Sequence, residues 1–114
     1  MVRSLKTDKK TSQDLTAGAL SYTTDYGRAF KLEQIIFRAS VAITETITIT
    51  LDSKHGASYD TILRVKSLSA EQNFVFIPDG ENNFQAGDEI KIQCTNANLT
   101  GELFAQVKAS EILK

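Results

Sequence analysis

The feature that most constrains this chain is an alternation of apolar and polar residues with a period of two. It is clearest in residues 43–52, where Ile47, Ile49 and Leu51 alternate with threonines. Successive side chains of a β-strand point to opposite faces, so this spacing predicts a strand with one buried and one wet face. Isoleucine and threonine also suit a pleated surface. The pattern therefore predicts antiparallel sheets.

The same alternation recurs along much of the chain. It is strong at Ile90, Ile92 and Cys94 and again at Leu103, Ala105 and Val107. Two weaker segments of the same kind are residues 15–23 and 59–68. We interpret all four segments as strands.

Two further segments require a choice. Residues 74–77 are apolar on both faces and stop at Pro78, so we expect them at the centre of a sheet or under a covering element. In residues 30–43, some apolar positions follow helical spacing and others follow strand spacing. We predict a strand there because β-branched and aromatic residues dominate.

Polar, glycine-containing turns separate these segments. About seven to eight short strands with such spacing predict an all-β fold, a two-sheet antiparallel sandwich or jelly roll. A chain of 114 residues supports one core, so we expect a single domain over residues 15–114. No apolar run is long enough to cross a bilayer, and the first residues do not resemble a signal peptide. We therefore expect a protein that is made in a cytoplasm and does not contact a membrane.

Residues 1–14 have a different composition, rich in Lys, Thr, Ser, Asp and Gln. Their cations outnumber their acids, which leaves the segment at +2 and the rest of the chain at −3 within a net charge of −1. We predict a flexible arm that becomes ordered on an acidic partner, with a frayed, dispensable terminus as the alternative. The residues expected to bind the partner are Val2, Arg3, Leu5, Lys6, Lys9 and Lys10.

The sequence offers little for catalysis. His55, the single histidine, lies in a polar turn, and Cys94, the single cysteine, continues an apolar row. We expect a loop residue and a buried, inert thiol. Nucleophile elbows, phosphate-binding glycine loops and Cys/His metal spacings do not occur. We therefore predict a protein without catalytic residues, cofactor or metal.

Three binding functions have candidate residues or surfaces to consider. Calcium could use the loop oxygens of Asp79, Glu81, Asn82 and Asn83, although these residues also make ordinary turns. Carbohydrate would need exposed aromatic faces, for which the candidates are Tyr22, Tyr26 and Tyr59, each more typical of a rim residue. Nucleic-acid binding is not expected, because the basic residues within the range 15–114 alternate with acidic ones and form no basic patch.

Three runs in the C-terminal part of the chain, residues 74–78, 84–92 and 96–107, carry a family resemblance. They resemble small β-sandwich virion proteins of tailed bacteriophages. The resemblance implies a copy-rich particle component, such as a head decoration or cement protein or an element of the neck or tail. Its implied partner is another virion protein, above all the major capsid protein, and its implied location is the virion.

We therefore expect a structural, non-catalytic protein attached to a capsid by its N-terminal arm. Small sandwiches must close their sheet edges against a neighbour, so we also expect a homo-oligomer, with a trimer favoured. The alternative is a carbohydrate- or receptor-binding domain of a fibre. A small enzyme subunit or ligand-binding barrel is the third hypothesis.

Overall fold

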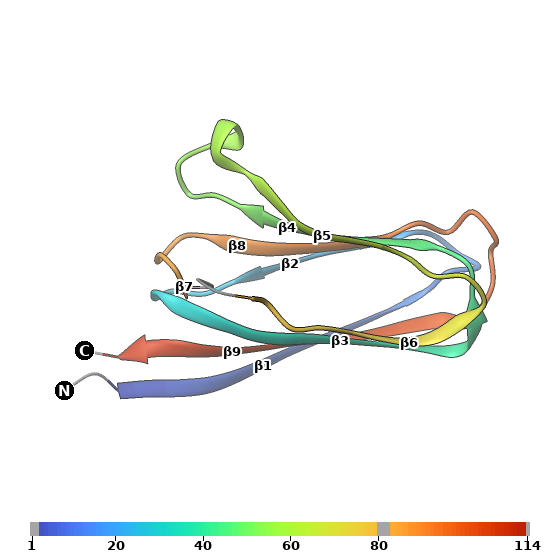
Figure 1. Ribbon diagram of the computed structural model, residues 1–114, viewed down its shortest axis with the longest axis horizontal. Coiled ribbons are helices and arrows are strands. Elements are labelled where there is room, and N and C mark those ends of the chain that lie inside the picture. Colours follow the sequence, from blue (N-terminus) through green and yellow to red (C-terminus); the bar gives the residue numbers. More distant parts are fainter. Residues whose placement is uncertain (1–2, 80–82, 114) are drawn as a thin grey trace.

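The computed structural model describes residues 3–79 and 83–113, whose strands form two antiparallel sheets packed as a sandwich (Figure 1). The first sheet has the order β1 (Arg3–Asp14), β9 (Glu102–Leu113), β3 (Phe30–Ile43) and β6 (Glu71–Phe76), and the short β7 (Asn83–Phe84) also pairs with β3. The second sheet has the order β2 (Leu20–Asp25), β8 (Glu89–Cys94), β4 (Thr46–Asp52) and β5 (Thr61–Ser67). The predicted all-β sandwich is confirmed, with nine strands in the described residues rather than seven or eight.

The pairing of the strands is nested. β1 pairs with β9, β2 with β8, β3 with β6, and β4 with β5, all antiparallel. Strands from the N-terminal half of the chain thus pair with strands from the C-terminal half, and the pairs are divided between the two sheets. This is the jelly roll, one of the two architectures that the sequence predicted.

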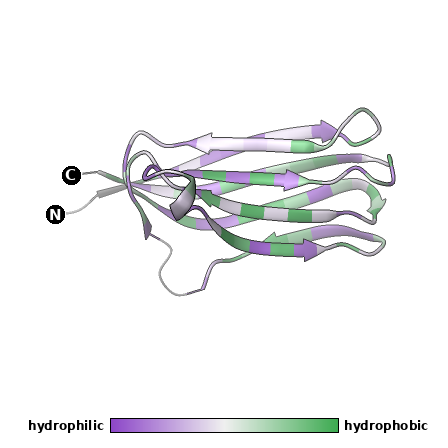
Figure 2. Ribbon diagram, turned by 90° about the horizontal axis from the view of Figure 1, so that it is seen from above, coloured by the Kyte–Doolittle hydropathy of each residue, from purple (hydrophilic) through white to green (hydrophobic). Residues whose placement is uncertain are grey.

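The core lies between the sheets and follows the predicted alternation, which Figure 2 shows as green and purple blocks along the strands. The predicted inward rows are buried in β8 and β9, and in β4 Ile47 and Ile49 are buried while Leu51 is partly buried. Large fully buried side chains include Phe30, Phe37, Ile47, Ile49, Ile90, Ile92, Leu103 and Val107. Burial of these side chains is the main source of stability for the sandwich.

Residues 30–43 form one long strand, as predicted, and a register shift explains their ambiguous pattern. The pairing of β3 with β9 slips between Leu32 and Gln34. Before the slip Leu32 is buried, and after it Ile35 and Phe37 are buried. The extra residue of a β-bulge changes the phase of the alternation, so the apolar spacing imitates a helix.

The prediction of a flexible arm is wrong for residues 3–14, because they form β1 and pair with β9 along their whole length. The domain boundary after residue 14 therefore falls inside the sandwich. β1 is an edge strand held by one backbone ladder, and its inner positions are half-buried polar side chains such as Thr7 and Thr11. An edge strand of this kind needs few apolar residues.

The prediction that residues 74–77 lie centrally or under a cover is also wrong. Residues 71–76 form β6, which stands at the edge of the first sheet next to β3. Val75 is 47% exposed and Ile77 is 66% exposed. Only Phe74 and Phe76 pack against the core.

Candidate functional site

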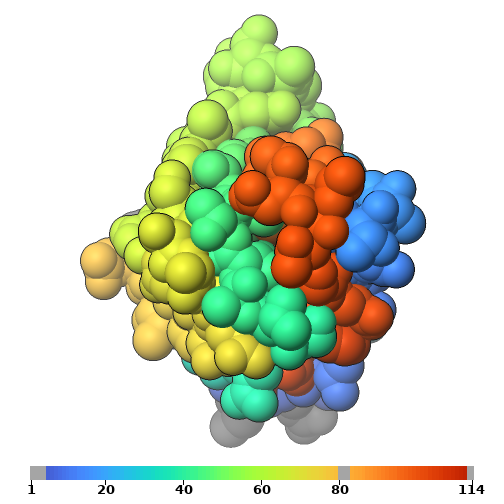
Figure 3. All heavy atoms as spheres, turned by 90° about the vertical axis from the view of Figure 1, so that its right-hand side faces the viewer, coloured from blue at the N-terminus to red at the C-terminus, as the bar shows by residue number. Residues whose placement is uncertain are grey.

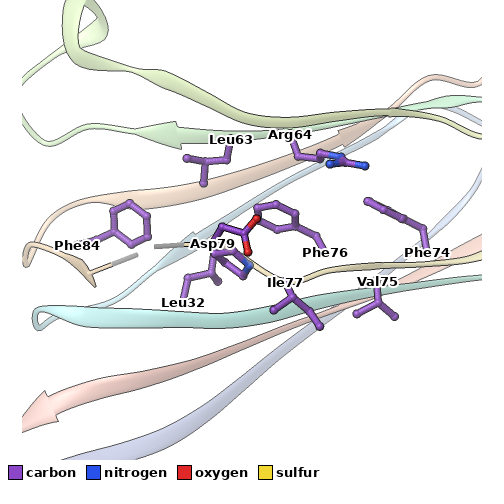
Figure 4. A pocket seen from close by; sticks show the side chains of 10 residues that line it. Leu32, Leu63, Arg64, Phe74, Val75, Phe76, Ile77, Asp79 and Phe84 are labelled. Atoms are coloured by element: carbon purple, nitrogen blue, oxygen red, sulfur yellow. The ribbon is translucent and has the colours of Figure 1, made fainter. Parts of the chain in front are cut away.

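An open cleft separates β5 from β6, the edge strands on one side of the sandwich. Its volume is about 470 Å³, and Figure 4 shows side chains from both strands around it. Phe74 and Phe76 point from β6 toward β5, while Val75 and Ile77 point to the opposite side. The lining also includes Leu32, Leu63, Arg64, Pro78, Asp79 and Phe84. The apolar core is therefore accessible at this edge.

Two cations lie above the aromatic end of the cleft. The guanidinium carbon of Arg64 is 5.8 Å from the centre of the Phe74 ring, and Lys66 Nζ is 5.9 Å from it. Lys66 Nζ also lies 3.9 Å from Glu71 Oε1 at the start of β6. The Arg64 and Lys66 positions thus give this end of the cleft a positive charge beside an aromatic face.

The outer face of the first sheet is the second candidate surface. Paired residues of neighbouring strands point to the same side, so the register defines rows across this face. One row contains Lys10, Gln106, Ile36 and Val75, and the next contains Ser12, Phe104, Arg38 and Asn73. We call this surface the basic face. Its cations are Lys6, Lys10, Lys31, Arg38 and Lys108, and its carboxylates are Asp8, Glu33, Asp14 and Glu102, of which the last two are paired where β9 begins.

Near the start of β9, the basic face holds an exposed aromatic ring beside two cations. Phe104 is 47% exposed and lines a groove of about 380 Å³ together with Ile36, Lys10 and Arg38. A second groove of about 370 Å³ is lined by the cations Lys6 and Lys108 and by the carboxylates Asp8 and Glu33. An apolar centre with a charged surround is typical of a protein-binding surface.

The residues predicted to bind a partner are divided between two sides of β1. Lys6 and Lys10 lie on the basic face, and Lys6 Nζ is 3.8 Å from Glu33 Oε1. Lys9 points inward, with its ammonium 5.1 Å from the centre of the buried Tyr26 ring. Leu5 is exposed near the start of β1. Arg3 begins the strand, and Val2 lies outside the described residues.

A buried carboxylate organises one end of the sandwich. Glu45, in the turn between β3 and β4, is 4% exposed and accepts hydrogen bonds from Thr95 Oγ1 (2.6 Å), the Ala97 amide (2.9 Å) and the Asn98 amide (2.8 Å). Figure 3 views this end, where the loop after β8 (orange) lies beside the β3–β4 turn (green). Glu45 therefore fixes the loop that leads into β9.

Asp88 has the same role at the other end. It is 6% exposed, and its carboxylate accepts hydrogen bonds from the amides of Lys54 (2.9 Å) and Gln85 (3.0 Å). It thus joins the loop after β4 to the turn before β8. The sequence indicated neither carboxylate, since Glu45 lies within residues 43–52, which were predicted as a strand, and Asp88 lies in an ordinary polar turn.

Cys94 and His55, the two residues considered for catalysis, lie in different surroundings. Cys94 is 2% exposed, and burial, with the nearby charge of Glu45, raises the pKa of its thiol to about 12. The predicted burial of the thiol is confirmed, and a buried thiol with a raised pKa is expected to react slowly. His55 lies in the exposed loop after β4, with Nε2 3.4 Å from Gln85 Oε1.

The tyrosines do not form a carbohydrate platform. Tyr26 is not a rim residue, because it is 1% exposed and stacks on Phe30 with ring centres 4.2 Å apart. Tyr22 packs partly against the core, and Tyr59 is 65% exposed. Stacking on a sugar ring needs an open aromatic face, which within this set only Tyr59 provides.

The calcium candidates are partly undetermined. Glu81 and Asn82 lie outside the described residues, whereas Asp79 and Asn83 lie on either side of them. Across residues 3–79 and 83–113, no group of three or more His, Cys, Asp or Glu side chains is arranged to hold a metal ion. Within the same ranges, no helix has the length and apolar character to cross a membrane.

Comparison with known proteins gives distant likenesses of shape. The chain matches no protein-family model and no curated protein. Among solved structures it is similar to the NLP core of Drosophila, studied for pentamer formation and histone binding, with 13% identity, a TM-score of 0.46, and coverage of 95% of this chain and 99% of that one. It is also similar to a chain of infectious bursal disease virus, Gx strain, with 15% identity, a TM-score of 0.34, and coverage of 98% of this chain and 32% of that one. The chain thus spans about a third of the length of the viral protein.

Proposed function

We propose that this protein is a structural, non-catalytic component of a virus particle, and specifically a head decoration protein of a tailed phage that attaches through the basic face. The observation that carries the proposal is Phe104, exposed on the outer face of a sheet beside Lys10 and Arg38. The assignment to a phage particle comes from the sequence resemblance.

The composition of the basic face favours an acidic protein surface as the partner. Lys6, Lys10, Arg38 and Lys108 would meet carboxylates and orient the encounter. Phe104 would supply the apolar anchor that an interface needs at its centre. The major capsid protein is the proposed partner. Jelly rolls occur in viral capsid proteins, although a fold alone does not assign a function.

The structure changes how attachment would work. The sequence predicted that flexible residues would attach the protein to its partner, whereas Lys6 and Lys10 are held on an ordered strand. A preorganised surface loses less conformational entropy on binding than a disordered segment. Attachment therefore belongs to the sheet face as a whole, and β1 is one part of it.

The test is binding to capsids assembled from the major capsid protein of the same virus without its accessory proteins. The variant Lys10→Glu/Arg38→Glu reverses two exposed charges beside Phe104. The control, Lys91→Glu, reverses a charge on the outer face of the other sheet, where Lys91 lies opposite Thr23 and Thr50. Cosedimentation gives the occupancy, and thermal unfolding verifies that each variant is folded.

We expect the wild type and Lys91→Glu to saturate the capsids and the double variant to lose about tenfold or more in affinity. Binding of the wild type should weaken as salt screens the charges. Failure of the wild type to bind, or equal binding by all three proteins, would contradict the proposal.

A further inference from the structure

The edge strands of the two sheets differ in their protection against pairing with other chains. β1 carries Lys6, Lys9 and Lys10, and it contacts β2 at the closed side of the sandwich. β5 carries Arg64 and Lys66, and its pairing with β4 contains a register shift. Charges and bulges of this kind discourage further strand addition.

β6 has a register shift in its pairing with β3 before Asn73, but it carries no protecting charge along residues 72–77. The segment Gln-Asn-Phe-Val-Phe-Ile contains no charged residue, and within the described chain β6 pairs with β3 alone. Val75 and Ile77 are exposed apolar residues on this edge, while Phe74 and Phe76 line the cleft. An uncharged apolar edge strand is a template for another strand.

We propose that β6 pairs antiparallel with β6 of a second copy of this chain, about a two-fold axis at Val75. In that register Phe74 of each copy lies opposite Phe76 of the other, and Asn73 lies opposite Ile77. Aromatic pairs directly across a ladder stabilise it. Pairing ends at Pro78, which has no amide hydrogen to donate.

The charges at the ends of the paired segment are balanced in number in this arrangement. Glu71 already lies 3.9 Å from Lys66, and Arg64 stands over the same Phe74 ring as Lys66. Beyond the paired residues, the two-fold register brings Asp79 of the second copy to the side of Glu71. These two carboxylates repel each other. Lys66 and Arg64 balance their charge at each end of the joined strands, so the charges there do not oppose a second copy.

This inference is independent of the proposed capsid partner and is tested on the purified full-length chain. Val75→Lys places a charge on the free edge, and Val41→Lys is the matched control, because Val41 is 46% exposed on the same sheet. Light scattering after size exclusion gives the mass. We expect a dimer for the wild type and Val41→Lys and a monomer for Val75→Lys.

A disulfide test locates the contact. Directly opposed residues in an antiparallel ladder have Cα atoms about 4.5–5.5 Å apart, which suits a disulfide. In a Cys94→Ala background, Val75→Cys should form a reducible dimer in oxidised glutathione, and Val41→Cys should not.

A monomeric or trimeric wild type, a dimeric Val75→Lys, or equal crosslinking at both positions would overturn the proposal. A monomeric wild type would mean that the β6 edge is free to pair with a strand of a different protein. A trimeric wild type would agree with the trimer expected from the sequence and not with two-fold pairing.

Discussion

Replacing Glu45 with Gln should destabilise the fold, because a buried charge there organises the loop before β9. The carboxylate accepts hydrogen bonds from Thr95, Ala97 and Asn98, with donor–acceptor distances of 2.6–2.9 Å. Hydrogen bonds to a charged group contribute more than neutral ones, but the two loop amides can reach water once the loop is freed. Glutamine keeps one acceptor oxygen. We therefore expect a loss of about 1–3 kcal/mol in the free energy of unfolding.

The loss should depend on pH in a defined direction. Burial alone would raise the pKa of Glu45, but the hydrogen bonds from Thr95, Asn98 and Ala97 outweigh it and hold the pKa below the ordinary value of 4.5. A carboxyl group with a lowered pKa in the folded state stabilises the fold fully above its unfolded pKa. That contribution is lost as the pH falls through the folded pKa. The difference between wild type and Glu45→Gln should therefore be largest near neutrality and shrink below pH 4.5.

Urea unfolding of both proteins at several pH values measures this difference. The control is Glu89→Gln, on the outer face of the second sheet opposite Asp25 and Asp52. Neutralising Glu89 removes a like-charge contact, so the free energy of unfolding should stay the same or rise slightly. The reasoning fails if Glu45→Gln changes the free energy of unfolding no more than Glu89→Gln does, or if its effect is the same at pH 7 and pH 3.

Three further changes test other parts of the fold. Gly101→Ala should lower the free energy of unfolding by about 1–3 kcal/mol, because φ is +80° there and a Cβ would lie 2.9 Å from a Val41 methyl group. The control is Gly27→Ala, where the space is open, and urea unfolding should show little change. Cys94→Ala should lower the free energy of unfolding by about 1–2 kcal/mol, and the native thiol should react with a thiol reagent at pH 8 only upon unfolding. Deletion of residues 3–14 should lower the melting temperature, since β9 would lose its ladder with β1. An unchanged melting temperature would instead support the hypothesis that these residues are a flexible arm.

The strands that bury one face were predictable because their alternation is local information. Ile47 and Ile49 show their inward direction in the sequence, and the structure buries both. β1 was not predictable in this way. Its half-buried positions include Thr7 and Thr11, and only the ladder with β9, about a hundred residues away in the chain, makes it a strand. A polar edge strand and a flexible arm have the same composition.

The candidate surfaces depend on topology, which local patterns do not contain. The apolar run of β6 resembles a central strand, and its place at an edge follows from the strand order. Glu45 stands between two threonines in a turn, and nothing nearby in the sequence indicates that residues 95–98 will surround it. The sequence did mark Lys6 and Lys10 as partner-binding residues, but not that they share a face with Arg38 and Phe104.

The two proposed contacts are compatible in geometry, and each would strengthen the other. A two-fold axis that pairs β6 with its copy runs perpendicular to the sheet, so the outer faces of both copies remain on the same side. The dimer would therefore present two basic faces in one continuous surface, each with its own Phe104. Binding of the first face to a capsid holds the second at a high effective concentration, so a modest affinity per face suffices for stable attachment. The uncharged edge of β6 would then serve attachment indirectly, by fixing the spacing of the two faces.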